Sequence, residues 1–258
     1  KIVFLKKNLS VTALCIFLFL SCKKDEEVVE PIRDVSQQSI KDDQSLEDFL
    51  STHFYNYESF NDQTLNPEIT FDTISGDNAT KTPLISQVLK KGISVLTSEG
   101  TFVNHNLYYL VAREGIGKRP SSVDSTYQSY EGSLINGSIF DSSKNPVWFD
   151  LTGVVRGFRE GMPSFRGGAF ETNSDNTVTF KNFGQGAIFF PSGLGYFSRT
   201  AGAVPEYSPL IFKINLYTVK QTDHDGDGVP SSEEFDNDGD GIADDTDGDG
   251  IADYLDRD

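Results

Sequence analysis

The strongest constraint on the fold is a series of six short segments, all between residues 107 and 219, that are rich in aromatic and β-branched residues. Residues of these types favour β-strands. The dipeptide Asn136-Gly137 separates two apolar runs and is a strong signal for a tight turn. The sequence therefore predicts a β-rich domain. Its expected strands are Leu107–Arg113, Ser125–Leu134, Val147–Leu151, Val178–Phe180, Ala187–Pro191 and Leu210–Val219.

A smaller helix and strand region, residues 45–105, is expected to precede this domain. Leu46, Phe49, Leu50 and Phe54 have helical spacing, which predicts a short amphipathic helix over residues 46–57 with its start at Ser45. Segments 71–74 and 93–96 resemble strands, and no catalytic constellation is visible here. Residues 23–44 are polar and charged, which predicts a flexible linker.

The first 22 residues indicate export. Three lysines precede an apolar run, Leu9–Leu20, which ends at Ser21-Cys22. A helix of this length would rise roughly 18 Å, well short of the ~30 Å core of a bilayer, so a secretory signal is favoured over a spanning helix. The end of the run resembles a bacterial lipobox, which implies that Cys22 is lipidated. An ordinary signal peptide with a chance cysteine is the alternative.

The charged segment after Cys22, Lys23 to Glu27, resembles the signal that sends some lipoproteins to the outer face of the outer membrane. A solvated tether is the alternative. The expected location is extracytoplasmic and lipid-anchored, on the periplasmic face or the cell surface. Both cysteines, Cys15 and Cys22, lie in the first 22 residues, so no disulfide is expected within residues 23–258.

The net charge of −17 is concentrated at the C-terminus. Residues 221–258 contain 13 Asp and 2 Glu against one Arg, a net charge of −14, so the first 220 residues carry only −3. No basic patch is present, which argues against nucleic acid as a partner. A dense acidic tail instead favours cations.

Three blocks within the β-rich region appear in a familiar order. The first is Tyr130-Glu131-Gly132, a turn, and Phe140-Asp141-Ser142-Ser143; the second runs from Val154 to Met162. The third runs from Leu194-Gly195-Tyr196 through Val204-Pro205 to Ile211-Phe212. This set resembles the FKBP-type peptidyl-prolyl cis-trans isomerases over residues 106–220. The resemblance implies an α+β fold in which a half-wrapped antiparallel sheet surrounds one short helix, here residues 154–161.

The resemblance also implies a pocket and a reaction. Phe158 would form the floor, Phe140 and Phe212 the walls, and Tyr196 and the Val155 N–H would donate to the substrate. Asp141 would orient its neighbours at the rim. Rotation about a prolyl bond needs no nucleophile, metal or cofactor, only an apolar pocket that favours the twisted amide. The full set of expected pocket residues is Tyr130, Phe140, Asp141, Val154, Val155, Phe158, Tyr196 and Phe212.

Three features depart from the family. Val147 stands where an aromatic wall residue is usual, and Phe197 stands where glycine is usual, so the loop is expected to turn differently. Residues 165–180 form an insertion whose Gly167-Gly168 and Asn173–Asn176 predict a hairpin or flap. This insertion could deepen the pocket or cover it.

The acidic tail, residues 221–258, matches a calcium-loop pattern. Residues 223–234 fit D-x-D-x-D-G-x₅-E, in which three carboxylates converge on one ion and the final Glu binds with two oxygens. Two further segments repeat with a period of nine and resemble thrombospondin type 3 repeats, which implies a chain wrapped around Ca²⁺. Without the ion, the density of like charge is expected to keep the tail unfolded. His224 is expected to be solvent-exposed. The expected ligands are Asp223, Asp225, Asp227, Glu234, Asp236, Asp238, Asp240, Asp244, Asp245, Asp247, Asp249, Asp253 and Asp256.

Three functions are compatible with these features. The first is a prolyl isomerase that assists the folding of exported or surface proteins. The second is a catalytically weak FKBP-fold module that binds polypeptides as a chaperone. The third is a structural or adhesive surface protein organised by calcium. The aromatic pocket residues favour the first.

Overall fold

The computed structural model describes residues 31–62 and 64–257. The predicted signal peptide and Cys22 lie outside the described residues. The architecture below is that of the compact unit that begins at Arg33. Within the described ranges, no helix is both long enough and apolar enough to cross a bilayer.

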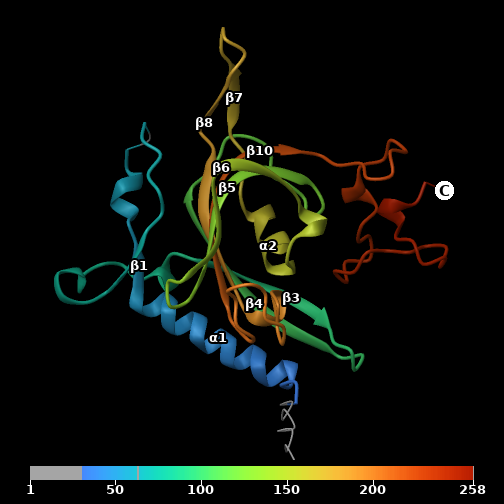
Figure 1. Ribbon diagram of the computed structural model, residues 1–258, viewed down its shortest axis with the longest axis horizontal. Coiled ribbons are helices and arrows are strands. Elements are labelled where there is room, and N and C mark those ends of the chain that lie inside the picture. Colours follow the sequence, from blue (N-terminus) through green and yellow to red (C-terminus); the bar gives the residue numbers. More distant parts are fainter. Residues whose placement is uncertain (1–30, 63, 258) are drawn as a thin grey trace, which may run out of the picture. The chain divides into compact units, whose positions relative to one another are not determined.

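A six-stranded, fully antiparallel sheet forms the centre of this unit, with the order β3-β4-β9-β10-β5-β6. The sheet curves around the short helix α2 (Arg156–Gly161), as Figure 1 shows. The expected antiparallel sheet around one short helix is therefore confirmed. The strands are β3 (Leu89–Leu96), β4 (Phe102–Arg113), β5 (Ser125–Leu134), β6 (Ile139–Asp150), β9 (Gly184–Phe190) and β10 (Leu210–Lys220).

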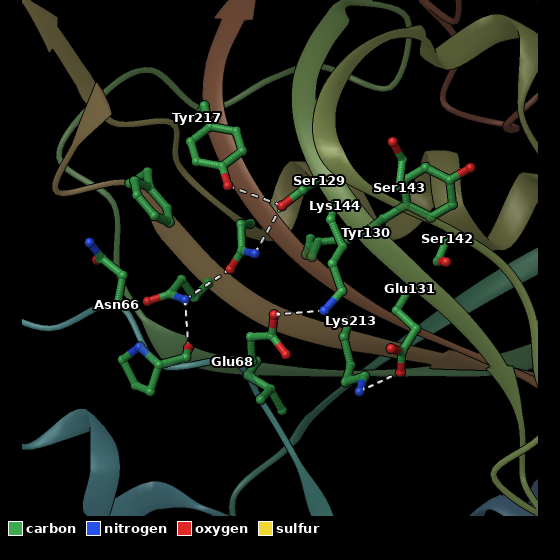
Figure 2. Close-up of a pocket in the computed structure, with 16 residues that line it drawn as sticks. Asn66, Glu68, Ser129, Tyr130, Glu131, Ser142, Ser143, Lys144, Lys213 and Tyr217 are labelled. Atoms are coloured by element: carbon green, nitrogen blue, oxygen red, sulfur yellow. Dashed lines mark hydrogen bonds and ion pairs between the residues drawn. The ribbon is translucent and has the colours of Figure 1, made fainter. Parts of the chain in front are cut away.

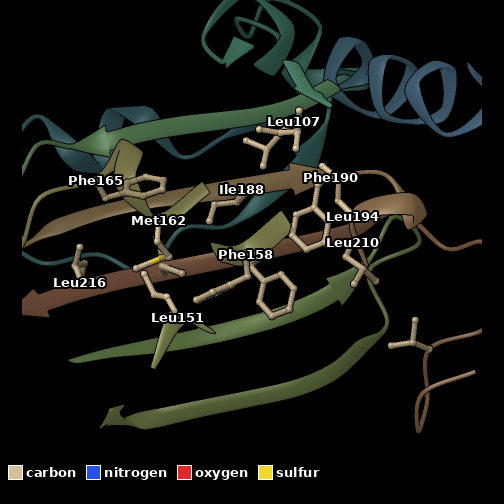
Figure 3. Packing of buried hydrophobic residues seen from close by; sticks show 14 residues of the cluster. Leu107, Leu151, Phe158, Met162, Phe165, Ile188, Phe190, Leu194, Leu210 and Leu216 are labelled. Atoms are coloured by element: carbon tan, nitrogen blue, oxygen red, sulfur yellow. The ribbon is translucent and has the colours of Figure 1, made fainter. Parts of the chain in front are cut away.

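Both faces of the sheet are covered, which explains why its central strands read as continuous apolar runs. All seven residues of β9 are buried. Because side chains alternate along a strand, Ile188 and Phe190 join the cluster around α2, whereas Ala187 and Phe189 join a second cluster under the N-terminal helix. Figure 3 shows the first cluster, in which Phe158 and Met162 pack against the sheet.

The N-terminal helix α1 spans Val35–Thr52, with Asp34 as its cap. Two predictions are therefore wrong, the flexible linker over residues 35–44 and the helix start at Ser45. The Ser45 hydroxyl donates to the Lys41 carbonyl inside the helix instead of capping it. The first half of α1 lacks an apolar stripe because its buried residues, Gln38, Ser39 and Asp42, are polar.

Buried Asp42 joins α1 to the loop after β9. Its Oδ2 accepts hydrogen bonds from the backbone N–H of Ser192, at 2.8 Å, and from the Ser192 hydroxyl, at 2.5 Å. Its Oδ1 accepts from the Gln38 amide at 2.7 Å. Burial nevertheless raises the pKa of Asp42, although these hydrogen bonds act in the opposite direction. The N-terminal helix thus fixes the start of the loop that carries Tyr196.

The other elements are short. Strands β1 (His53–Tyr55) and β2 (Phe71–Thr73) form a separate pair. The boundary predicted between residues 105 and 106 falls inside β4, and β3 pairs with β4, so the main sheet already starts at Leu89. The 3-10 helices are η1 (Tyr57–Phe60), η2 (Gly76–Asn78), η3 (Leu84–Ser86), η4 (Leu151–Gly153), η5 (Met162–Ser164), η6 (Ser192–Leu194), η7 (Ser231–Glu233) and η8 (Asp253–Leu255).

The insertion forms the predicted hairpin, made of β7 (Ala169–Thr172) and β8 (Val178–Lys181). Figure 1 shows it projecting from the main sheet. The ring of Phe180 packs against Tyr127 and Tyr217, with centroids 5.5 and 5.4 Å apart, while Phe170 is 60 % exposed. Aromatic contacts of Phe180 therefore fix the base of the hairpin, and the exposed ring of Phe170 lies on the directly paired residue of the other strand.

A buried histidine makes the fold sensitive to acid. His105 on β4 is 1 % exposed, and within the described chain neither of its ring nitrogens has a hydrogen-bond partner. Burial, followed by the charge of Arg156, lowers the pKa of His105 from 6.5 to about 4. The unfolded chain therefore binds this proton first as the pH falls.

We predict that His105 destabilises the fold progressively between pH 6.5 and pH 4, by about 3 kcal/mol in total. Urea unfolding across this range would show it, since His105→Leu should remove that part of the pH dependence. If the wild-type and His105→Leu stabilities fall in parallel with pH, the buried, unpaired position assigned to His105 is wrong.

The packing of α2 against β9 leaves no room for a methyl group on either glycine of the helix, Gly157 or Gly161. A Cβ on Gly157 would lie 2.3 Å from Phe190 Cδ2, and one on Gly161 would lie 2.6 Å from Ile188 Cδ1. The helix therefore lies directly against β9. By contrast, no atom lies within 4 Å of a Cβ built on Gly153, two residues before Val155.

We predict that Gly157→Ala lowers the free energy of unfolding by ~1–3 kcal/mol, because overpacking outweighs the higher helix propensity of alanine. The matched control, Gly153→Ala, should leave stability unchanged or raise it by up to ~1 kcal/mol. Thermal unfolding of both variants would test this. Equal effects at the two positions would contradict the described packing of α2.

Candidate functional site

A cavity of about 810 Å³ opens between β5, β6, α2 and the loop after η6. Strands β5, β6 and β10 line one side of the cavity, and α2 with the Phe158 ring lines another. The residues that line it are Tyr130, Asp141, Trp148, Phe149, Asp150, Gly153, Val154, Val155, Arg156, Phe158, Gly195, Tyr196, Arg199 and Phe212.

Seven of the eight expected pocket residues line this cavity, although they come from five separate parts of the chain. The exception is Phe140, which does not line the cavity. Its ring lies behind Phe212, edge-on at a centroid distance of 5.5 Å, and covers Gly132. Phe140 therefore supports the wall that Phe212 forms, and its expected place as a wall residue is not observed.

Aromatic rings in mutual contact build the apolar part of the cavity. Phe158 is 2 % exposed and meets Phe212 edge-on at 5.1 Å and Phe149 edge-on at 6.0 Å. Phe212 in turn stacks on Phe190 at 5.8 Å. Such contacts fix the ring orientations, so the cavity presents a preformed apolar surface.

Polar groups lie at the rim. The Tyr130 hydroxyl donates to Asp141 Oδ2 at 2.7 Å. Burial, followed by this hydrogen bond, raises the pKa of Tyr130 to about 12, so the hydroxyl keeps its proton at neutral pH. Among the described residues, neither the Tyr196 hydroxyl nor the Val155 N–H has a hydrogen-bond acceptor. Both donors are thus free to meet a carbonyl oxygen in the cavity.

Two of the expected departures concern Val147 and Phe197. Val147 is not in the cavity lining, but Trp148 and Phe149 are, so the wall is aromatic after all. Phe197 takes the left-handed conformation, with φ of 49°, which glycine adopts without strain. Its ring meets Tyr207 edge-on at 5.2 Å, a contact that offsets the backbone cost of ~1–2 kcal/mol.

Seven lining residues were missed by the sequence analysis: Trp148, Phe149, Asp150, Gly153, Arg156, Gly195 and Arg199. Part of the signal for Phe149 was available, since residues 147–151 were expected to form a strand; the structure pairs this segment with β5, which carries Tyr130. The hairpin of the insertion contributes no residue to the lining. It therefore neither deepens nor covers the cavity.

A smaller cavity of about 250 Å³ lies between segment 66–69 and strands β5, β6, β9 and β10 (Figure 2). Its charged groups are paired: Lys213 with Glu131 at 2.5 Å and Lys144 with Glu68 at 3.6 Å. A hydrogen-bond chain runs from Gln185 through Asn215 and Ser129 to Tyr217. These contacts stabilise the junction between the N-terminal region and the sheet.

The acidic tail contains three carboxylate clusters that repeat along the chain. In each cluster the carboxylate oxygens of three Asp residues lie within 4.8 Å of one another. All six glycines in these loops have positive φ, between 76° and 104°. The clusters are Asp223/Asp225/Asp227, Asp236/Asp238/Asp240 and Asp245/Asp247/Asp249.

The remaining expected ligands have different roles. Asp244 and Asp253 accept hydrogen bonds from the backbone N–H of Asn237 and Thr246, at 2.6 and 2.7 Å, which gives two successive turns the same geometry. Buried oxygens of Glu234, Asp225 and Asp236 have no hydrogen-bond partner within the described chain.

The tail is attached to the rest of the unit through His224, which was expected to be exposed. Its side chain is only 13 % exposed, and its Nε2 lies 3.0 Å from Asp150 Oδ2 while its Nδ1 lies 2.8 Å from the Ser231 hydroxyl. The expectation was wrong because Asp150 lies 74 residues away in the sequence. Asp150 also accepts a hydrogen bond from the Thr152 N–H, at 2.9 Å, directly before the α2 segment.

Comparisons with known proteins match the part of the chain that contains this cavity. The family described as FKBP-type peptidyl-prolyl cis-trans isomerase matches residues 117–217. The chain is 32 % identical over 117 residues to the probable isomerase FkpA of Neisseria meningitidis, covering 44 % of this chain and 38 % of that protein. It is 33 % identical over 121 residues to the isomerase Mip of Coxiella burnetii, covering 45 % and 46 %.

A third relative, named outer membrane protein MIP, from Legionella longbeachae, is 30 % identical over 136 residues and covers 51 % of this chain and 49 % of that one. The crystal structure of FkpA from Escherichia coli aligns with a TM-score of 0.37 and 28 % identity over 49 % of this chain and 51 % of that one. The chain thus spans about half or less of these proteins. Residues 117–217 form a domain of the FKBP-type peptidyl-prolyl cis-trans isomerase family.

Proposed function

We propose that this protein is a peptidyl-prolyl cis-trans isomerase that acts on proline-containing segments of exported or surface polypeptides. The observation that carries the proposal is the cavity itself. It brings Tyr130, Tyr196, Phe158, Phe212 and the Val155 N–H to one apolar, partly open site. Uncatalysed prolyl isomerisation takes tens to hundreds of seconds, slow enough to limit folding.

The geometry suits this reaction. The barrier of ~18–20 kcal/mol comes from amide resonance, which is lost as the bond twists. The proline ring would rest on Phe158, between Phe149 and Phe212, where water is excluded from the reacting amide. The Val155 N–H and the Tyr196 hydroxyl would hold the flanking carbonyl groups while the bond rotates. Tyr130 and Asp141 would shape the rim through their hydrogen bond.

The proposed location is the bacterial envelope, with the chain held at a membrane by acyl groups on Cys22. The lipobox-like sequence supports the anchor, and the Legionella relative, an outer membrane protein by name, supports an envelope setting. Several buried acyl chains would give stable anchoring, since each CH₂ contributes ~0.8 kcal/mol.

Calcium is the proposed ligand of the acidic tail. Carboxylate oxygens are the donors that Ca²⁺ prefers, and three clusters supply them at short mutual distances. Burial, followed by the charges of Asp227, Asp225 and Asp223, raises the pKa of Glu234, whose Oε2 is buried and has no hydrogen-bond partner among residues 31–62 and 64–257. A divalent cation beside this cluster would satisfy that oxygen.

We predict that the full chain accelerates cis-trans isomerisation of a proline tetrapeptide in a protease-coupled assay. Phe158→Ala should lower kcat/KM at least about tenfold, a loss of ~1.4 kcal/mol of transition-state stabilisation. Tyr196→Phe should lower it by a smaller factor, because only one donor is lost.

Two matched variants control for stability. Phe165 is 1 % exposed in the same cluster as Phe158 but does not line the cavity, and Tyr109 belongs to that cluster without lining the cavity. Phe165→Ala and Tyr109→Phe should therefore retain catalysis while they remain folded. If the wild-type protein is folded but does not catalyse the reaction, the proposed isomerase activity is wrong. The alternative is then a polypeptide-binding module, which the exposed ring of Phe170 supports.

We predict that the tail binds Ca²⁺ and folds with it. Calorimetry should detect binding, and EDTA should reduce the protection of residues 222–257 from hydrogen exchange. Asp225→Asn, Asp238→Asn and Asp247→Asn should each weaken one site at least about tenfold. Asp77→Asn, at an exposed residue of η2, is the control and should leave binding unchanged. Tail protection that is identical with and without Ca²⁺ would contradict the proposal.

A further inference from the structure

The acidic tail docks against the elements that form the cavity, and this contact has consequences for the proposed reaction. His224 binds Asp150, which lines the cavity and caps the segment before α2. The backbone N–H of Thr222 donates a hydrogen bond to Asp124 Oδ1 at 3.1 Å. Through His224, the tail thus contacts a residue that lines the cavity without lining the cavity itself.

A second docking contact is made with α2 itself. Phe235 is 7 % exposed, and the guanidinium of Arg159 lies 5.3 Å from the centre of its ring. Arg156 donates to the Gly241 carbonyl at 3.2 Å and to the Ser94 carbonyl at 3.0 Å. Among the described ring contacts, the Tyr254 ring packs against two other tail residues, His224 and Phe235. These two residues dock the tail on the rim and on α2, and they share Tyr254 as a support.

The residues that dock the tail lie within or next to the carboxylate clusters: His224 lies inside the first cluster, between Asp223 and Asp225. Phe235 stands between Glu234 and Asp236, and Gly241 directly follows Asp240. Each cluster holds three carboxylates within 4.8 Å, and their mutual repulsion favours an opened loop unless a cation is bound. The positions of Phe235 and Gly241 therefore depend on the state of the first two clusters.

The contacted residues of α2 lie next to the cavity. The helix has only six residues, so Arg156 and Arg159 directly flank Val155 and Phe158 along the chain. A shift of α2 moves both the Val155 N–H and the Phe158 ring. Both groups are proposed to hold the peptide, so their displacement weakens peptide binding.

We propose that Ca²⁺ binding in the tail and peptide binding in the cavity are positively coupled, with His224 and Phe235 as positioning residues that hold the rim and α2. This inference rests on the proposed function. The coupling is reciprocal, as linkage requires: Ca²⁺ strengthens peptide binding by the same factor by which peptide strengthens Ca²⁺ binding.

The test uses the full chain and two probes, Ca²⁺ and an uncleaved proline tetrapeptide. Trp148, the single tryptophan, lines the cavity and provides a fluorescence signal for peptide binding. The peptide Kd should be at least about fivefold lower in Ca²⁺ than in EDTA. The change should appear mainly in KM rather than in kcat.

Two variants separate docking from metal binding. Phe235→Ala removes a docking side chain without removing a carboxylate, whereas Ile251→Ala removes an apolar side chain of the third repeat that is 47 % exposed. Phe235→Ala should still bind Ca²⁺ by calorimetry but lose the difference between the peptide Kd values in Ca²⁺ and EDTA. Ile251→Ala should retain that difference.

The outcomes are distinguishable. If catalysis and Ca²⁺ binding are both present but the peptide Kd is equal in Ca²⁺ and EDTA, the coupling is overturned while the proposed function stands. If Ca²⁺ does not bind, the coupling is overturned together with the calcium proposal. A Phe235→Ala variant that retains the full fivefold difference overturns the role of the docking contact.

Discussion

The contact between α2 and β9 is the constraint on which the site depends. Glycines at positions 157 and 161 let the helix lie directly on Phe190 and Ile188, with no side chain between them. This short separation places the Phe158 ring against Phe149 and Phe212. It also brings the N–H of Val155, at the start of α2, to the edge of the cavity. A bulkier residue at either glycine would push α2 away from β9 and displace both the Phe158 ring and the Val155 N–H.

The parts of the chain outside the FKBP-type segment help to fix the rim. From one side, α1 reaches the loop after β9 through Asp42 and Ser192, only four residues before Tyr196. From the other side, the acidic tail reaches Asp150 through His224 and α2 through Phe235. The cavity thus lies between two supports that are distant from each other in sequence. Burial of both sheet faces makes the platform between them rigid.

Much of the fold could be predicted because local signals coincide with it. Strand-forming runs, Asn136-Gly137 and the ordered motif blocks mark the sheet, the turn and the helix, and seven of the eight expected residues meet in one cavity. The misses have physical causes. The first half of α1 buries polar residues such as Gln38 and Asp42, which resemble a linker in sequence. The His224–Asp150 pair depends on a contact across 74 residues, which no local pattern reveals.

The central claim is that the cavity between β5, β6, α2 and the Tyr196 loop twists a prolyl bond. NMR exchange spectroscopy of a proline peptide, with amide shifts of the protein recorded in parallel, tests it most directly. The account predicts cis-trans exchange that the protein accelerates, with the Val155 amide among the most perturbed resonances. Perturbations centred instead on Gln185 and Lys213, on the opposite face of the sheet, would contradict it.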